Sequence, residues 1–368
     1  MRIFRLTKLI FLLLVPFSGF AQFRVYSNEF LNIGAGARGL GMGAAQSASV
    51  SDGTAGYWNP AALTGVKDHP SINIMHASYF DNIGKYDFGS VALPIDDNKR
   101  TLGFTVLRFA VDDIPNTLFL VQPDGSINYN NITTFSSADY AFLFSYAQKV
   151  RDDDDVKISF GGNAKVIYRK VGHFATALGF GFDAGFKMQK RNYTLGIVGK
   201  DITTTFNAWS FHFTDQEQQV LYLTNNSIPV KSTEMTAPSL MVGNAYRFIL
   251  SPSVSLLGEA DLNFTFVGRI NTLVSSKAVS IDPRIGLEAS FKNIFFVRAG
   301  IYNFQQALAD GDTTNQKKVW IYQPSIGAGF KIKNVEIDYA FSNLANQSNP
   351  LYTNIFSLRV DLIKKEDY

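Results

Sequence analysis

The 368-residue chain contains no cysteine, which excludes disulfide bonds, thiolate metal sites and cysteine nucleophiles. Its only histidines are His69, His76, His173 and His212, which stand far apart without an HExxH or GxSxG motif around them. A Ser-His-Asp set assembled in space stays open, but no catalytic residue and no cofactor can be assigned. We therefore expect a protein that is not an enzyme.

A metal-binding motif is also lacking. The acidic run at 152–155 does not have the central glycine and final glutamate of an EF-hand loop. We predict a solvated turn at this position and no metal site.

Outside the first few residues, neither basic nor acidic residues are in excess. The chain carries 34 basic and 31 acidic residues, and the excess of three lies at its start, at Arg2, Arg5 and Lys8. The remainder is balanced, which argues against a nucleic-acid partner.

The three early cations precede an apolar stretch at 9–17 that is too short to span a bilayer. Small residues, Gly19 and Ala21, follow it where a signal peptidase requires them. We predict a signal peptide at residues 1–21 and a mature protein that begins at Gln22.

Long apolar runs are missing from the rest of the chain, and none approaches the ~20 residues of a membrane helix. From about residue 70 onward, apolar and polar residues instead alternate with the period of a strand. In 156–169 the even positions carry no charge, whereas the odd positions include Lys157, Lys165 and Arg169. Both a soluble β-sandwich and a membrane barrel alternate in this way.

The length and the number of the strands favour the barrel. Fourteen strands are predicted, near 71–80, 85–94, 100–109, 137–148, 156–169, 174–188, 192–200, 238–248, 254–265, 281–291, 294–303, 318–332, 335–342 and 352–364. Many exceed the ~5 to 6 residues of sandwich strands, and their number is even. We predict an all-β fold, a 14-stranded antiparallel transmembrane β-barrel over residues 70–368, in the bacterial outer membrane.

The connections between these strands alternate in length, as short periplasmic turns and longer outer loops do in such barrels. The short ones are near 96–98, 152–155, 190–191, 251–252, 292–293 and 333–334. The long ones are 110–136, 201–237, 266–280, 304–317 and 343–351, with short exceptions near 81–84 and 170–173. An aromatic C-terminal residue, Tyr368, also fits an outer-membrane barrel.

The segment before the barrel contains GAGARG, from Gly34 to Gly39, which satisfies the GxGxxG pattern of nucleotide-binding loops. It follows no hydrophobic strand and opens no βαβ unit, so we reject nucleotide binding. Glycine and alanine would let this segment, residues 22–69, pack close to a barrel wall as a plug. A loose periplasmic tail is the alternative, although Tyr57 and Trp58 argue against it. Charges that face the lumen would tie the plug to the wall, among them Lys157, Lys165, Arg169, Asp183, Glu259, Asp261, Arg284 and Glu288.

GARGLGMGAA, followed by SDGTAGYWNPAALTG and a long strand, resembles the PorV/PorQ family of FadL-like outer-membrane proteins. The resemblance covers roughly residues 34–65, with motif positions Gly34, Gly36, Arg38, Gly39, Gly41, Gly43, Trp58, Asn59 and Pro60. It implies a plug, a fourteen-stranded barrel and a part in type IX secretion. The implied partners are secreted cargo proteins, bound through their C-terminal signal domains, and a larger translocon or attachment complex. Nothing in the chain matches a cargo-contact signature.

Apolar residues are concentrated in the two longest predicted outer loops. They are Ile114, Leu118, Phe119 and Leu120 in the first and Phe206, Trp209, Phe211 and Phe213 in the second. Exposed apolar surface of this kind marks a binding site. Three interpretations stay open: docking of a secreted protein or translocon, uptake of a hydrophobic small molecule as in FadL, and packing of the loops among themselves. The resemblance favours docking.

Overall fold

The structure is a computed structural model that describes residues 27–79, 82–122, 124–228, 231–308, 318–342 and 352–363. The predicted signal peptide at 1–21, the mature start at Gln22 and the C-terminal Tyr368 lie outside these ranges. Among the helices in the described ranges, none is long and apolar enough to cross a membrane.

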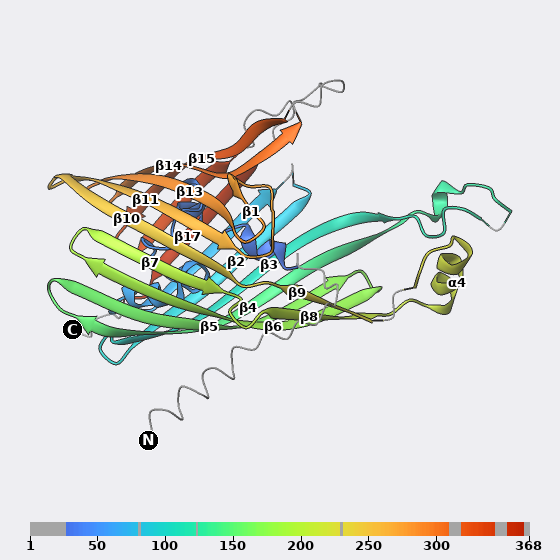
Figure 1. The fold of residues 1–368 in the computed structure, drawn as a ribbon, viewed down its shortest axis with the longest axis horizontal. Helices are drawn as coiled ribbons and strands as arrows, with labels where there is room; N and C mark the ends of the chain where they lie inside the picture. The colour runs from blue at the N-terminus through green and yellow to red at the C-terminus, as the bar shows by residue number, and fades with distance from the viewer. Residues whose placement is uncertain are drawn as a thin grey trace, which may run out of the picture.

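Fourteen strands form the wall, and each pairs antiparallel with its neighbour until β17 closes the ring on β1 (Figure 1). They are β1 (Ser71–Tyr79), β2 (Gly84–Ile95), β3 (Arg100–Asn116), β4 (Thr133–Asp152), β5 (Val156–Val171), β6 (Ala175–Lys190), β7 (Tyr193–Lys200), β10 (Ser239–Ser251), β11 (Val254–Thr265), β13 (Ser280–Phe291), β14 (Phe295–Leu308), β15 (Lys318–Ile332), β16 (Val335–Ser342) and β17 (Thr353–Asp361). The predicted fold, a 14-stranded antiparallel transmembrane β-barrel, is confirmed.

At the arms, the wall strands β7 and β10 are extended by two further strands. After an interruption at 201–204, β7 resumes as β8 (Thr205–Phe211), which pairs with the upper part of β6. The next strand, β9 (Lys231–Thr236), pairs with β8 and leads into β10. The prediction that 201–237 is a plain loop was therefore wrong, because most of it forms a hairpin whose tip carries helix α4 (Asp215–Leu223).

The hairpins β3–β4 and β8–β9 project beyond the barrel at one end, which we call the arm end (Figure 1). The tip of the first holds the single turn η3 (Tyr129–Asn131). At the other end, the short-turn end, tight connections join β2 to β3, β10 to β11 and β13 to β14. A two-residue strand, β12 (Val274–Ser275), pairs with β13 only.

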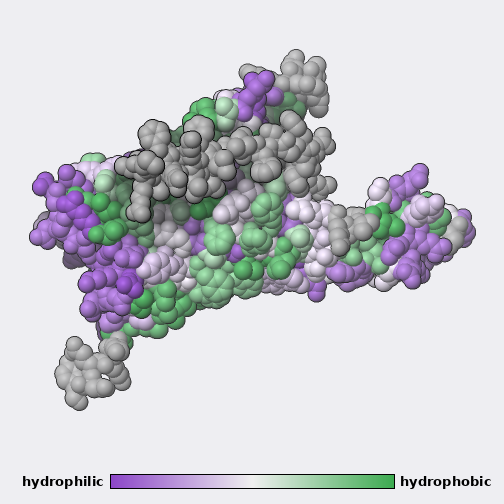
Figure 2. Space-filling model, turned by 60° about the horizontal axis from the view of Figure 1, so that its bottom comes forward, coloured by the Kyte–Doolittle hydropathy of each residue, from purple (hydrophilic) through white to green (hydrophobic). Residues whose placement is uncertain are grey.

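The wall has its apolar face outside and its polar face inside, the reverse of a soluble protein. On neighbouring strands, Phe160 and Phe180 are 53% and 61% exposed, whereas the lumen-facing Lys165 is 4% exposed. Figure 2 shows an apolar band across the visible wall, between a hydrophilic short-turn end and hydrophilic arms. Such a surface is stable in lipid, where a closed ring also pairs every backbone group.

The N-terminal segment, residues 27–69, lies inside the ring (Figure 1). It forms four single turns: η1 (Glu29–Asn32), α2 (Ala37–Gly41), α3 (Ala55–Trp58) and η2 (Pro60–Gly65). Its apolar residues, including Leu40, Trp58 and Leu63, join Tyr86 and Leu107 of the wall in one buried core. The core of this protein therefore fills the lumen next to β1–β5.

Candidate functional site

Two carboxylates on β11 hold the middle of the N-terminal segment. Asp261 accepts hydrogen bonds from the backbone N–H groups of Gln46 and Ser47, at 3.0 and 2.9 Å. Glu259 accepts from the N–H groups of Ala48 and Ser49, at 2.7 and 3.2 Å. Four consecutive amides therefore find partners on one strand, and leaving one buried amide without a partner would cost about 1–3 kcal/mol.

An ion pair fixes the segment to β13. Arg38, on α2, donates to both carboxylate oxygens of Glu288, at 2.8 and 3.1 Å. Burial disfavours the charged form of Arg38, but the contact with Glu288 outweighs it and raises the pKa of the guanidinium. Arg298 on β14 binds the same carboxylate at 2.8 Å, so Glu288 joins the segment to two wall strands.

Two aromatic residues stabilise the N-terminal segment through hydrogen bonds within it. The indole N–H of Trp58 donates to the carbonyl of Ala35, and the hydroxyl of Tyr57 donates to the carbonyl of Leu31. Burial raises the pKa of Tyr57, which keeps this hydroxyl protonated, and it also accepts from the N–H of Gly34.

The backbone is extended at Asn59, directly before Pro60. Asn59 (φ −156°, ψ 103°) uses its side chain to cap η2, which begins at Pro60. Its amide also donates to the carbonyls of Ser47 and Phe186, so it joins the segment to β6. Proline is favoured at this first helical position because its missing N–H would have no partner there.

The glycines of the motif permit close approach of two backbones. Gly43 has a φ of 64°, and a Cβ there would lie 2.5 Å from the backbone nitrogen of Ile301. Gly41 faces Gly327, where a Cβ would meet backbone at 3.2 Å. Gly34 and Gly36 also have positive φ, and a Cβ on Gly39 would collide with Gln46 and Trp58. Close packing therefore explains the glycines of the motif, and no bound phosphate is needed to account for them.

Beside the segment, towards the arm end, lies a cavity of about 570 Å³ that we call the arm cavity. Phe135, Phe174, Trp209, Phe211 and Phe213 line much of it, together with Leu118 and Pro115 from β3–β4. Its polar lining includes Ser232 and Glu234 of β9. The lining thus comes from both arms and from the β5–β6 hairpin.

The aromatic rings of the arm cavity form a continuous series. Phe135 packs edge-on against Phe174 at 5.2 Å between centroids, and Phe174 lies 5.8 Å from Phe213. Phe213, Phe211 and Trp209 follow with parallel rings at spacings of 6.4 Å. Such a wall offers ring faces and edges to an apolar molecule.

The arm cavity meets the start of the N-terminal segment at Glu234. This carboxylate accepts from the Ser27 hydroxyl at 3.0 Å and lies 3.4 Å from Arg169, whose guanidinium covers Trp209. Asn28 donates to Thr236 on the same strand. The position of the segment and the shape of the cavity are therefore physically linked.

The structure brings only some of the predicted loop residues together. Leu118, Trp209, Phe211 and Phe213 line the arm cavity, whereas Ile114, Phe119 and Leu120 do not. Phe206 is 40% exposed on the outer face of β8, because its neighbours Thr205 and Asn207 are the buried, inward residues. The sequence analysis missed Phe135, Phe174 and Glu234, whose contribution depends on how distant hairpins pair.

The lumen charges divide into two groups. Glu259, Asp261 and Glu288 hold the N-terminal segment, as described above. Lys165 instead binds Asp183 at 2.8 Å and Asp201 at 2.5 Å, beside the interruption between β7 and β8. Arg169 pairs with Asp139, Arg284 lies 3.7 Å from Asp282, and Lys157 contacts Asp152 at the turn 152–155.

No family model and no curated protein matches the chain. Solved structures do. The chain resembles the CymD monoaromatic hydrocarbon channel at 11% identity and a TM-score of 0.54, over 91% of this chain and 99% of that one. It resembles the toluene transporter TbuX of Ralstonia pickettii at 11% identity and a TM-score of 0.54, over 90% of this chain and 99% of that one. It also resembles the toluene transporter TodX of Pseudomonas putida at 12% identity and a TM-score of 0.55, over 92% of this chain and 99% of that one. At such identity the likeness shows a shared barrel fold.

Proposed function

We propose that this protein is an outer-membrane barrel that binds a hydrophobic small molecule in the arm cavity and admits it to the barrel. The observation that carries the proposal is the aromatic series from Phe135 to Trp209, on the inner face of the wall. Among its polar residues, Glu234 accepts a hydrogen bond from Ser27 of the N-terminal segment. The similar solved barrels are described as hydrocarbon channels and toluene transporters, which supports this ligand class.

The proposal assigns the two ends of the barrel to the two sides of the outer membrane. The arms face outward and the short turns face the periplasm, as the alternation of loop lengths requires. A ligand in the arm cavity meets the N-terminal segment next, and Leu40, Trp58 and Leu63 of that segment are almost fully buried in the lumen. Passage through the barrel therefore requires this plug to shift.

Binding is testable through two phenylalanines of one strand. Removing Phe211 deletes part of the cavity wall, and we expect Phe211→Ala to weaken toluene binding about tenfold. Phe206→Ala removes the same ring from the outer face of β8 and should leave the affinity unchanged. The readout is the fluorescence of Trp209, one of three tryptophans in the chain, during titration in detergent. Equal effects of the two variants would contradict the proposal.

A second candidate function is docking of a protein, and one observation favours it. The tips of both arms expose large apolar side chains: Ile127 and Tyr129 on one arm are 58% and 71% exposed, and Tyr222 and Leu223 on the other are 77% and 74% exposed. Secreted cargo or a larger translocon, as in type IX secretion, would cover such residues. The resemblance at 34–65 supports this partner class.

Docking and uptake predict different effects of substitutions at the arm tips and in the arm cavity. A Tyr129→Ser, Tyr222→Ser, Leu223→Ser variant should lose copurifying protein while it still binds toluene. Phe211→Ala should do the opposite. If the triple variant copurifies the same proteins as the unmodified barrel, docking at the arm tips is refuted.

A further inference from the structure

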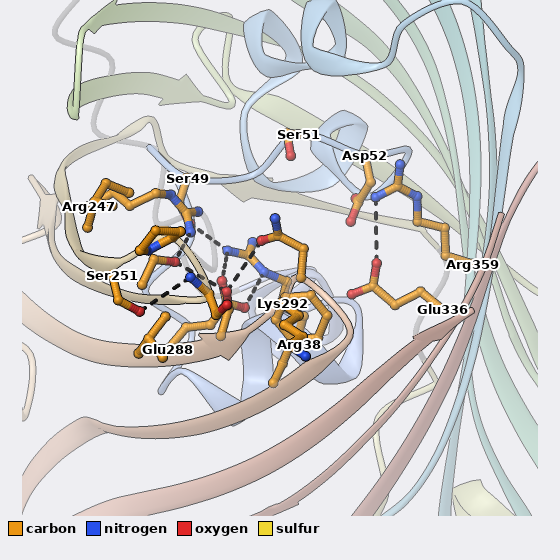
Figure 3. Close-up of a pocket in the computed structure, with 18 residues that line it drawn as sticks. Arg38, Ser49, Ser51, Asp52, Arg247, Ser251, Glu288, Lys292, Glu336 and Arg359 are labelled. Atoms are coloured by element: carbon orange, nitrogen blue, oxygen red, sulfur yellow. Dashed lines mark hydrogen bonds and ion pairs between the residues drawn. The ribbon is translucent and has the colours of Figure 1, made fainter. Parts of the chain in front are cut away.

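A second cavity, of about 350 Å³, opens between the N-terminal segment and the wall at the short-turn end (Figure 3). We call it the mouth cavity. The segment contributes Arg38, Ser49 and Asp52 to it, and the wall contributes Arg247, Lys292 and Arg359 among others. These cations come from opposite sides and converge on one space.

The carboxylates of the mouth cavity already have cationic partners, apart from Asp52. Glu288 is bound by Arg38 and Arg298, as described above. Glu336 lies 3.6 Å from Arg298 and 3.9 Å from Arg359. Asp52 accepts from the N–H and the hydroxyl of Thr54.

Arg247 differs from these groups. Its side chain projects inward from β10, and within the described ranges the guanidinium makes one hydrogen bond, from Nη1 to the hydroxyl of Ser255, at 3.2 Å. A guanidinium carries five N–H donors, so four of them have no protein partner there. Lys292 also lines the cavity and has no ion pair in the described part of the chain, but its ammonium lies 5.4 Å from the ring centroid of Phe291, on the outer face of β13.

Hydroxyl groups accompany Arg247 in the lining. Ser251, Ser253 and Ser255 on the β10–β11 turn line the mouth cavity, and Ser290 does so from β13. The acidic residues of the lining are Asp52, Glu288 and Glu336, and the carboxylate of Glu288 is shared by two arginines. Guanidinium and hydroxyl donors around a small space are the groups that bind oxyanions.

We propose that the mouth cavity is a binding site for a small oxyanion, a phosphate or a carboxylate, held by Arg247 with the serine hydroxyls. Arg38 and Ser49 reach the same space from the N-terminal segment. A bound anion therefore bridges the segment to the wall and stabilises the docked segment. This inference is independent of what the arm cavity binds.

The test is calorimetric titration of the intact protein in detergent with inorganic phosphate and with succinate, against sodium chloride of matched ionic strength. We expect saturable binding of at least one of the two. Arg247→Gln should weaken it at least about tenfold, because it removes a charge-assisted donor pair. Arg191→Gln removes an equally basic residue from the exposed β6–β7 turn and should leave the affinity unchanged.

Two further measurements separate a lost site from a misfolded barrel. Ser255→Ala keeps every charge and should weaken binding several-fold, and each variant is checked for heat-modifiable migration on a gel. The anion should raise the thermal midpoint of the unmodified protein but not that of Arg247→Gln. Equal affinities for Arg247→Gln and Arg191→Gln, no saturable binding of either anion, or binding of Mg²⁺ instead would each overturn the proposal.

Discussion

At the scale of single residues, the N-terminal segment shows that one glycine pattern can occur both in a nucleotide-binding loop and in a segment packed inside a barrel. GAGARG fits a nucleotide-binding pattern, yet its Gly39 packs against Gln46 and Trp58, and Gly43 shortly after it lies against the backbone of β14. The alternation of apolar and polar residues along the strands was enough to predict that Glu259, Asp261 and Glu288 face the lumen. Their partners could not be predicted, because Gln46 and Asp261 are more than 200 residues apart and meet only once the ring closes.

Gly43→Ala tests this close approach. The new Cβ would meet the backbone of Ile301 at 2.5 Å, at a φ of 64° that alanine rarely adopts. We expect a loss of about 2 kcal/mol or more in the free energy of unfolding, from strain and overpacking together. Gly89→Ala is the matched control, since no atom lies within 4 Å of a Cβ there. Urea unfolding in detergent gives both values, and equal stabilities would contradict the packing described.

The anchor at Asp261 makes a second prediction. Asp261→Leu removes the acceptor for two buried amides, so residues 46–49 should become accessible to protease in the folded barrel. Asp261→Asn keeps an acceptor oxygen and should protect the segment better than leucine does. The rate of cleavage by a non-specific protease distinguishes them, and equal rates for the two variants would refute the anchor.

At the scale of elements, the period of two located all fourteen wall strands but not β8, β9 or α4. In β8, Thr205 and Asn207 face inward beside outward Phe206, and further along Trp209 and Phe211 also face inward. Apolar residues thus change faces within one strand, because its upper half lines the arm cavity. A sequence pattern that assumes one apolar face per strand cannot detect such an element.

Helix α4 should depend on pH through its capping box. Glu217 accepts from the N–H of Thr214 at 2.8 Å and contacts His173 at 2.7 Å. Desolvation opposes ionisation, but these hydrogen bonds outweigh it and lower the pKa of Glu217 below its usual value of 4.5. A lowered folded pKa stabilises the helix above pH 4.5, and this stabilisation disappears as the pH falls through the folded value.

The loss of helix stability can be measured by amide hydrogen exchange of α4, corrected for the intrinsic effect of pH on the exchange rate. We expect protection at neutral pH to fall several-fold under acid conditions, in line with a cap of about 0.5–2 kcal/mol. Glu217→Gln should show lower protection at neutral pH and little change on acidification. The same pH response in both proteins would show that Glu217 is not the group responsible.

At the scale of the whole molecule, the reversal of inside and outside separates this barrel from a soluble sandwich. Ile326, on the outer face of β15, is 61% exposed. Ile326→Arg should cost about 2–4 kcal/mol in a lipid bilayer if this position lies near the midplane. Tyr222→Arg, at an arm tip, should be nearly neutral. Unfolding titrations in vesicles compare the two, and equal costs would contradict the assignment of the lipid-facing surface.

The central claim is that the arm cavity holds a hydrophobic small molecule. The most direct measurement is a crystal structure of the protein soaked with bromobenzene, with bromine located by its anomalous signal. We expect a peak between Phe174 and Phe211, inside the cavity and next to Trp209, which disappears in the Phe211→Ala variant. Bromine found only on the outer face of the barrel, or an empty cavity at saturating ligand, would contradict it.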